Sequence, residues 1–402
     1  MEFWSLPKLR DLGVENANLT GEIPPSLGNI TSLKVLALSR NHLGGIIPST
    51  LGQLKLLYRL NLAVNNFSGM VPPSLYNLSS LRILSITLNH LVGNLPSAIG
   101  LTLPNLEELL IGGNNFSGPI PHSLFNASKL QKLSIAQNQF TGKVPINVGN
   151  LNDLQHINLE TNDLGTRSSG DLDFISSLTN CSNLQTLSIS MNQFGGSLPP
   201  SVGNFSNKFS VLLLGRNQVV GEIPYEIERL RNLYFLGMED NFFSGGIPVG
   251  IRNLRKLQSL SLGDNQLSGN IPSFLNNMSQ LFELSLKNNF LEGSIASSLE
   301  SQNLQYLDLS SNKFTGTIPK DIGLSSQLLD LSLAHNSLTG SIPLEVANLK
   351  NLEYFGVSEN KMSGSVPNIF ASLLSLLKHN FEILLVFLEL PIEAKVFLSL
   401  LA

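Results

Sequence analysis

The chain repeats one pattern of apolar and polar positions about every 24 residues. One copy, starting at Leu260, reads LSLGDNQLSGNIPSFLNNMSQL. With x for variable positions, the frame is L-x-L-x-x-N-x-L-x-G-x-I-P, followed by x-x-L-x-x-L-x-x-L. The alternation predicts a short strand in which Leu260 and Leu262 face inward, with Leu267 and Ile271 beside them. No single copy can bury these side chains, so the copies must stack to form a core.

One column of the frame is polar although it lies within an apolar pattern. The chain must turn after each strand, and backbone groups inside the turn need hydrogen-bond partners. An asparagine side chain carries donors and an acceptor, so it can bond to its own coil and to the next one. The sequence therefore predicts a ladder of stacked asparagines, with Ala17 in the earliest copy. The ladder consists of Asn41, Asn65, Asn89, Asn114, Asn138, Asn162, Asn192, Asn217, Asn241, Asn265, Asn289, Asn312, Asn336 and Asn360.

The period and the pattern predict an α/β leucine-rich-repeat solenoid of about 15 coils. We expect a curved right-handed superhelix with a parallel β-sheet on its concave face and irregular or 3₁₀ segments on the other. Prolines such as Pro272 lack an N–H, so they start a segment outside the strand ladder. We assign residues 1–370 to the solenoid, with an interruption at 163–183, and residues 371–402 to an apolar tail without repeats.

Two motifs carry a resemblance to a known family. The N-x-L-x-G-x-I-P version is similar to the plant-specific leucine-rich repeat and resembles the ectodomains of plant receptor-like kinases. In one copy, GTRSSGDLDFISSLTNCSNL replaces the G-x-I-P half. This stretch resembles the subfamily that contains the plant receptors for bacterial elongation factor Tu and flagellin, and the rice blight-resistance receptor. The matching residues are Asp171, Leu172, Asp173, Phe174, Leu178, Asn180 and Cys181.

The resemblance implies a function and a location. It implies an ectodomain that binds a peptide or protein ligand, with a co-receptor kinase as a further partner, in the perception of microbial patterns. The parent family lies in the plasma membrane with this part on the extracellular side. The resemblance also implies a signal peptide, a membrane span and a serine/threonine kinase, for which this sequence shows no motif. We therefore expect a truncated product, a partial gene model or a kinase-less paralogue.

Composition and motifs argue against catalysis in this chain. Charged residues make up 13% and the net charge is −4, so there is no basic footprint for nucleic acid. We find no metal-spaced His/Cys cluster, nucleophile elbow or kinase motif, and expect no catalytic residue, metal or cofactor. Asp171 and Asp173 suit a metal or an acid/base pair, but we favour a solvated loop with helix-capping carboxylates. Cys181 is read as a packed apolar group rather than a reactive thiol.

The termini show no membrane signal. The start, MEFWSLPKLRDL, has no basic region followed by an apolar run, so we expect no signal peptide. The apolar C-terminal stretch is interrupted by Glu389, Pro391, Glu393 and Lys395, so we expect no transmembrane span.

The outward strand positions supply candidate ligand contacts. Stacking would bring a mixed-charge group with one aromatic side chain onto neighbouring coils of the concave face, which suits a peptide. The alternative is an ordinary solvated face. The candidate contacts are Arg216, Phe235, Glu239, Asp240, Asp264, Glu283 and Lys287.

Nine N-x-S/T triplets are candidate glycosylation sites. Three directly follow the ladder column, and the others lie shortly before a strand. Both positions are expected at the surface, where a glycan would not block stacking. The candidates are Asn18, Asn29, Asn66, Asn77, Asn115, Asn126, Asn180, Asn204 and Asn277.

The alternative function is a kinase-less receptor-like protein or a secreted leucine-rich-repeat inhibitor. The interruption argues against the inhibitor, because such inhibitors are shorter and uninterrupted. The sequence does not identify the ligand, since the surface columns vary without disturbing the fold.

Overall fold

The structure is a computed structural model that describes residue 6 and residues 8–272, 278–295 and 303–365. It divides into two compact units, residues 1–233 and 234–402, and each is described by itself. The expected tail at 371–402 and the candidate site Asn277 lie outside the described residues.

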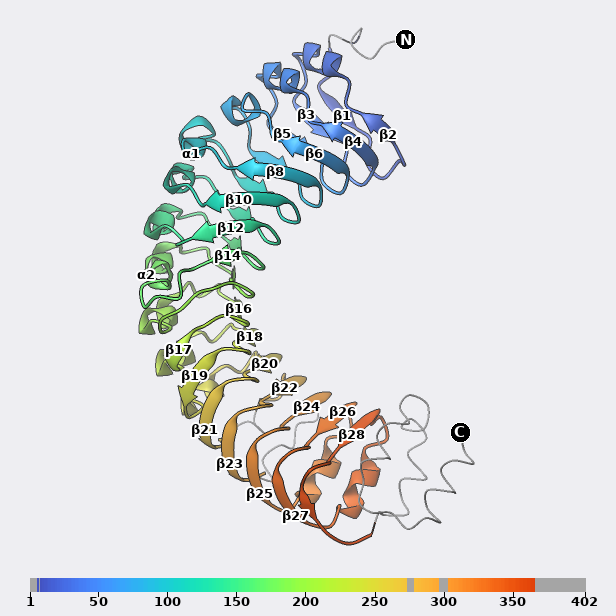
Figure 1. Ribbon diagram of the computed structural model, residues 1–402, viewed down its shortest axis with the longest axis vertical. Coiled ribbons are helices and arrows are strands. Elements are labelled where there is room, and N and C mark those ends of the chain that lie inside the picture. The colour runs from blue at the N-terminus through green and yellow to red at the C-terminus, as the bar shows by residue number, and fades with distance from the viewer. Residues whose placement is uncertain (1–5, 7, 273–277, 296–302, 366–402) are drawn as a thin grey trace. The chain divides into compact units, whose positions relative to one another are not determined.

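Each coil of the first unit contributes one short strand to a parallel main sheet (Figure 1). Neighbouring strands align frame position on frame position, so that Leu36 pairs with Leu60 and Leu60 with Leu84. The main-sheet strands are β1 (Asp11–Gly13), β3 (Val35–Ala37), β5 (Arg59–Asn61), β7 (Ile83–Ser85), β9 (Glu108–Leu110), β11 (Lys132–Ser134), β13 (His156–Asn158), β15 (Thr186–Ser188) and β16 (Val211–Leu213).

A second sheet, which the repeat pattern does not predict, follows the turn of most coils. It forms because the N-x-L-x-G segments of successive coils also run parallel and in register, as Gly69 does with Leu91. Its strands in the first unit are β2 (Thr20–Glu22), β4 (His42–Ile46), β6 (Asn66–Met70), β8 (His90–Asn94), β10 (Asn115–Pro119), β12 (Gln139–Gly142) and β14 (Asp163–Leu164). Beyond the interruption, β17 (Val220–Glu222) starts a separate sheet of the same kind.

One-turn helices complete the coils, and most of them begin just after a frame proline. In Figure 1 those of the first unit, including α1 and α2, stack along one edge. They are η2 (Pro25–Asn29), η3 (Ser49–Gln53), η4 (Leu75–Asn77), α1 (Ile99–Thr102), η5 (His122–Asn126), η6 (Ile146–Asn150), α2 (Asp173–Ser177), η7 (Leu178–Asn180), η8 (Pro200–Asn204) and η9 (Tyr225–Arg229).

The second unit repeats this plan. Its main-sheet strands are β18 (Phe235–Gly237), β20 (Ser259–Ser261), β22 (Glu283–Ser285), β24 (Tyr306–Asp308), β26 (Asp330–Ser332) and β28 (Tyr354–Gly356). Its second-sheet strands are β19 (Phe242–Gly245), β21 (Gln266–Asn270), β23 (Phe290–Ser294), β25 (Lys313–Gly316), β27 (Ser337–Gly340) and β29 (Lys361–Met362). Its described helices include η10 (Val249–Asn253), η13 (Lys320–Leu324) and η14 (Leu344–Asn348). The fifteen main-sheet strands confirm the predicted leucine-rich-repeat solenoid of about 15 coils.

The frame leucines form the core. Leu260, Leu262 and Leu267 are 0% exposed, and Ile271 is 5% exposed. Each buried aliphatic side chain of this kind contributes roughly 1.5–3 kcal/mol. Stacking therefore supplies the main stabilisation, as the alternation of the sequence implies.

The asparagines lie inside the turns and join successive coils. Asn265 Oδ1 accepts the backbone N–H of Phe243 in the preceding coil at 2.9 Å. Its Nδ2 donates to the carbonyls of Met238, Leu262 and Gly263 at 3.0, 3.2 and 3.0 Å. Asn41 satisfies the first coil in the same way, because its Oδ1 accepts the N–H groups of both Ala17 and Leu19. The amide thus serves its own coil and the one before it.

The residue just before each ladder position is held in the left-handed conformation. Its φ lies between 49° and 66° in all fifteen coils, from Asn16 to Glu359. Glycine fills this position only at Gly113, whereas the β-branched Val64 and Thr161 adopt φ of 57° and 54°. Such residues are disfavoured there, so the turn geometry overrides local preference.

We expect Asn265→Ala to destabilise the second unit by about 1–3 kcal/mol. The three carbonyls keep other hydrogen-bond partners, since Asn241, Asn289 and the Asp240 N–H also donate to them. The N–H of Phe243, in contrast, loses the acceptor it points at. The urea midpoint of unfolding measures the loss, and the exposed Asn270→Ala is the matched control. Equal midpoints for the two variants would contradict the ladder's role.

Val64→Asn should raise the free energy of unfolding by about 1 kcal/mol, because asparagine tolerates the left-handed region better than valine. Val92→Asn is the control, since both valines are 40% exposed but Val92 lies in β8 and has no positive φ. Thermal unfolding of the two variants compares them directly. A gain at both positions, or at neither, would show that backbone strain at Val64 is absent.

Candidate functional site

Six of the seven candidate contacts lie on neighbouring coils of the second unit. Phe235 and Glu283 begin β18 and β22, so they stand on the face of the main sheet. The other four lie in the turns after β18, β20 and β22, namely Glu239, Asp240, Asp264 and Lys287. Arg216 is exposed in the turn after β16 and belongs to the first unit. We call the six residues of the second unit the strand-face cluster.

Several charges of the strand-face cluster are already paired. Lys287 Nζ lies 3.1 Å from Asp264 Oδ2, and Asn288 Nδ2 donates to Asp264 Oδ1 at 2.9 Å. Ser259 Oγ donates to Glu283 Oε2 at 2.8 Å. These contacts fix the orientation of Asp264 and Glu283 before any ligand arrives.

Glu239 differs from its neighbours, because its buried Oε2 has no hydrogen-bond partner among the described residues. The equivalent position of the next coil is Gly263, and the stem of Lys287 lies over it, within 2.8 Å of where a Cβ would stand. Asp240 beside Glu239 is exposed. This pair is therefore the part of the cluster with charge left to neutralise. Beside it, the Phe235 ring meets Tyr234 edge-on at 5.1 Å between centroids.

Negative charge continues along the same sheet face. Burial and then the nearby charge of Asp308 raise the pKa of Asp330 to about 6. These two carboxylates come from the adjacent strands β24 and β26. Among the described residues of the second unit, this face therefore presents more acidic than basic side chains without an ion pair.

The expectation of a solvated, helix-capping Asp171 is wrong. Asp171 is 1% exposed, and its carboxylate accepts the backbone N–H groups of Thr166, Ser168 and Gly195 at 2.7, 3.0 and 3.1 Å. Asp173 stands in the first turn of α2, where no side chain caps the helix. The reason is local: a loop replacing the G-x-I-P half has N–H groups without strand partners, and Asp171 serves them. The loop then covers Gly195, where the second sheet is broken.

Cys181 is fully buried, and burial raises the pKa of its thiol to about 11. A thiol with such a pKa is a poor nucleophile, because the thiolate is the reactive form. Among the described residues, no group of three His, Cys, Asp or Glu side chains could hold a metal ion. The helices of the described part are all too short or too polar to cross a bilayer.

The eight described glycosylation candidates are all exposed, and all lie in the first unit. Asn66 and Asn115 begin second-sheet strands, and Asn18 stands just before β2. The other five each end a one-turn helix, namely Asn29, Asn77, Asn126, Asn180 and Asn204. None of the eight lies in a main-sheet strand, so a glycan at any of them would leave the stacking intact.

Comparison with protein families finds the leucine-rich repeat along the chain. One leucine-rich-repeat family model matches residues 31–91. A second matches residues 105–127, 129–151, 183–205, 256–278, 303–324 and 327–349. A curated relative, the LRR receptor-like serine/threonine-protein kinase EFR of Arabidopsis thaliana, is 53% identical over 140 residues, which is 35% of this chain. The match spans only 14% of that relative's length.

Solved structures show the same architecture. The plant peptide hormone receptor RGFR1 in complex with RGF2 has a TM-score of 0.86 and 34% identity, over 93% of this chain and 58% of that one. The Arabidopsis receptor kinase HAESA, in complex with the peptide hormone IDA and the co-receptor SERK1, has a TM-score of 0.61 and 31% identity. That alignment covers 93% of this chain and 74% of the receptor chain.

We predict that Asp171 supplies stability that is lost in acid. Burial alone would raise its pKa, but hydrogen bonds from Thr166, Gly195 and Ser168 outweigh burial and lower it to about 2, from 3.8. A carboxyl with a lowered folded-state pKa stabilises the fold above its unfolded pKa, and the contribution fades as pH falls from about 4 to 2. The contribution is roughly 2 kcal/mol.

The Asp171→Asn variant checks this. At pH 7, the urea concentration at its unfolding midpoint should lie well below that of the unmodified chain. The difference between the two midpoints should narrow between pH 4 and pH 2. Asp173→Asn, at an exposed neighbouring position, is the control and should show no such trend. A gap that stays constant across this pH range would rule out the assigned role.

Proposed function

This chain belongs to the leucine-rich repeat family, in the form found in plant receptor kinase ectodomains, and we propose that it recognises a peptide or protein ligand on its strand face. The observation that carries the proposal is the strand-face cluster. There, Asp264 and Glu283 are pre-oriented by neighbours, while Glu239 and Asp240 have no ion-pair partner among the described residues. Pre-oriented polar groups reduce the entropic cost of binding, and unpaired charge selects a complementary partner.

The similar structures support a peptide as the ligand. RGFR1 was solved with RGF2, and HAESA with the peptide hormone IDA and the co-receptor SERK1. By the same logic, a co-receptor kinase is the second partner of this chain. The unneutralised acidic pair favours a ligand with a basic residue at the point of contact.

Perception of microbial patterns is the finer form of the proposal. The interruption around Asp171–Cys181 resembles that of an immune-receptor subfamily, and the similarity to EFR agrees with that placement. The parent would be a receptor serine/threonine kinase of the plasma membrane, with these coils outside the cell. The exposure of eight glycosylation candidates supports that side of the membrane. In this scheme the chain contributes binding, and catalysis belongs to the kinase of the parent.

A kinase-less receptor-like protein would use the same strand face, so it remains the alternative. The two differ in the coding sequence that follows these coils. A membrane span and a kinase there establish the receptor kinase, whereas a stop shortly after a span favours the receptor-like protein.

The binding proposal is tested with an immobilised library of synthetic peptides and the purified chain. Some peptides should bind the unmodified chain. Their affinity for the double variant Glu239→Lys and Asp240→Lys should be at least tenfold lower, because the charge reversal repels a basic contact. The control combines Asp321→Lys and Glu345→Lys, which lie in η13 and η14 away from the strand face. Equal retention of both variants would overturn the proposed site, and failure of every peptide to bind would overturn peptide recognition.

A further inference from the structure

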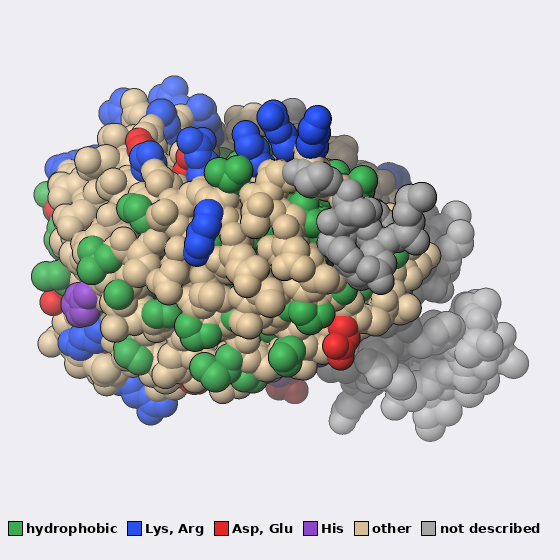
Figure 2. Space-filling view, turned by 90° about the horizontal axis from the view of Figure 1, so that it is seen from above, with side chains coloured by type: hydrophobic (Ala, Val, Ile, Leu, Met, Phe, Trp, Pro, Cys, Tyr) green, Lys and Arg blue, Asp and Glu red, His purple; other side chains and the backbone are tan. Residues whose placement is uncertain are grey.

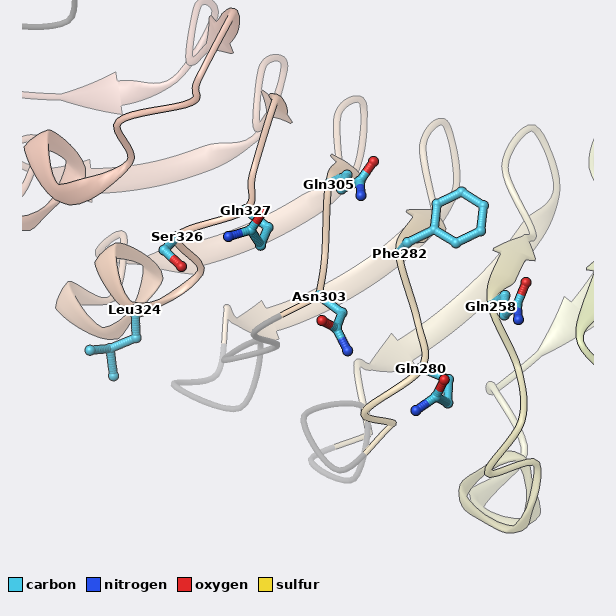
Figure 3. A pocket seen from close by; sticks show the side chains of 8 residues that line it. All are labelled: Gln258, Gln280, Phe282, Asn303, Gln305, Leu324, Ser326 and Gln327. Carbon is cyan, nitrogen blue, oxygen red and sulfur yellow. The ribbon is translucent and has the colours of Figure 1, made fainter.

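The second unit carries a groove whose lining contains no residue of the strand-face cluster. Its volume is about 660 Å³, and eight side chains line it (Figure 3). Three of them, Gln258, Phe282 and Gln305, stand immediately before β20, β22 and β24. The groove therefore follows the edge at which the main-sheet strands begin, whereas the turns and the second sheet lie where these strands end. We call it the amide groove.

The lining is polar but uncharged. It consists of Gln258, Gln280, Phe282, Asn303, Gln305, Leu324, Ser326 and Gln327. Five of these are amides, each with two N–H donors and a carbonyl acceptor. Figure 2 shows that uncharged polar side chains and backbone also dominate the visible surface of the molecule, which has only 13% charged residues. A ligand of this groove is thus selected by hydrogen bonding rather than by charge.

Most of these amides have no partner within the described part of the chain. The side chains of Gln258, Gln280, Gln305 and Gln327 make no hydrogen bond to any described residue. Asn303 is anchored, since its Nδ2 donates to the carbonyl of Ser279. Together they offer a set of free donors and acceptors on a fixed backbone.

The amides form rows with the spacing of the coils. One row holds the residues just before the strands, Gln258, Phe282 and Gln305, and the other holds Gln280, Asn303 and Gln327, two residues before the equivalent positions. Adjacent strands lie about 4.8 Å apart. That distance is close to the advance per sugar residue along an extended oligosaccharide. A chain of sugars lying across the coils would therefore meet a new amide at each ring.

We propose that the amide groove binds a neutral, extended oligosaccharide. Vicinal hydroxyl groups donate and accept together, as the amides do. The half-buried ring of Phe282, between Gln258 and Gln305 in its row, offers an apolar platform for the C–H face of a sugar (Figure 3). The volume falls within the range of about 300–1,000 Å³ typical of small-molecule sites. This site is separate from the strand-face cluster and does not depend on the proposed peptide recognition.

The test is saturation-transfer NMR and calorimetry on the purified chain with defined sugars. Cellohexaose, xylohexaose and mannohexaose represent neutral fragments of free polysaccharides. A high-mannose N-glycan represents a sugar chain linked to a protein. An anionic oligogalacturonide is the charge contrast. At least one neutral probe should bind, and Phe282→Ala and Gln305→Ala should each weaken it by tenfold or more. Which neutral probe binds distinguishes a free polysaccharide fragment from a protein-linked glycan.

Two further variants keep the test specific. Gln185→Ala occupies the same frame position before β15 in the first unit and should leave sugar binding unchanged. Phe282→Trp retains an aromatic platform and should retain binding. The proposal fails if no neutral probe binds, if binding survives both alanine variants in a folded chain, or if the oligogalacturonide alone binds there.

Discussion

The hydrogen-bonding requirement of the turn after each strand governs this structure. The chain reverses direction inside a close-packed stack, where backbone N–H and carbonyl groups have no access to water. One asparagine per coil meets this requirement, as Asn265 does by accepting from Phe243 and donating to three carbonyls. Because each amide bonds to the coil before it, the ladder also sets the register in which coils stack. The buried leucines stabilise the stack, and the asparagines determine the register in which successive coils pack.

Because the inward-facing residues determine the fold, the outward-facing residues can vary and can bind other molecules. In the second unit, the strand face holds charged residues that partly neutralise one another, and the described residues supply no ion-pair partner for Glu239 and Asp240. The edge where the strands begin holds uncharged amides around Phe282. Two surfaces of different chemistry thus arise from one repeated frame, since each frame position stacks into its own row. A solenoid built in this way can evolve one surface without disturbing the other.

Inward-facing positions could be predicted from the sequence, because their period reflects a physical demand repeated in every coil. Leu260 and Asn265 are examples, and the buried Cys181 is another. The second sheet was missed because its pairing partners lie in the next coil and leave no alternation in the sequence. The left-handed backbone at Val64 was missed because local preference argues against it. Asp171 was misjudged because its loop partners, Thr166 and Gly195, become visible only in three dimensions.

Hydrogen–deuterium exchange of the unmodified chain tests the central claim most directly. The relevant amides are those that donate to ladder oxygens, such as the N–H groups of Leu43, Phe243 and Leu338. If the asparagines hold the turns, these amides exchange as slowly as those of the main-sheet strands in every coil. Exchange at the rate of open surface loops would contradict the account, because it would mean that water, and not asparagine, satisfies the turns.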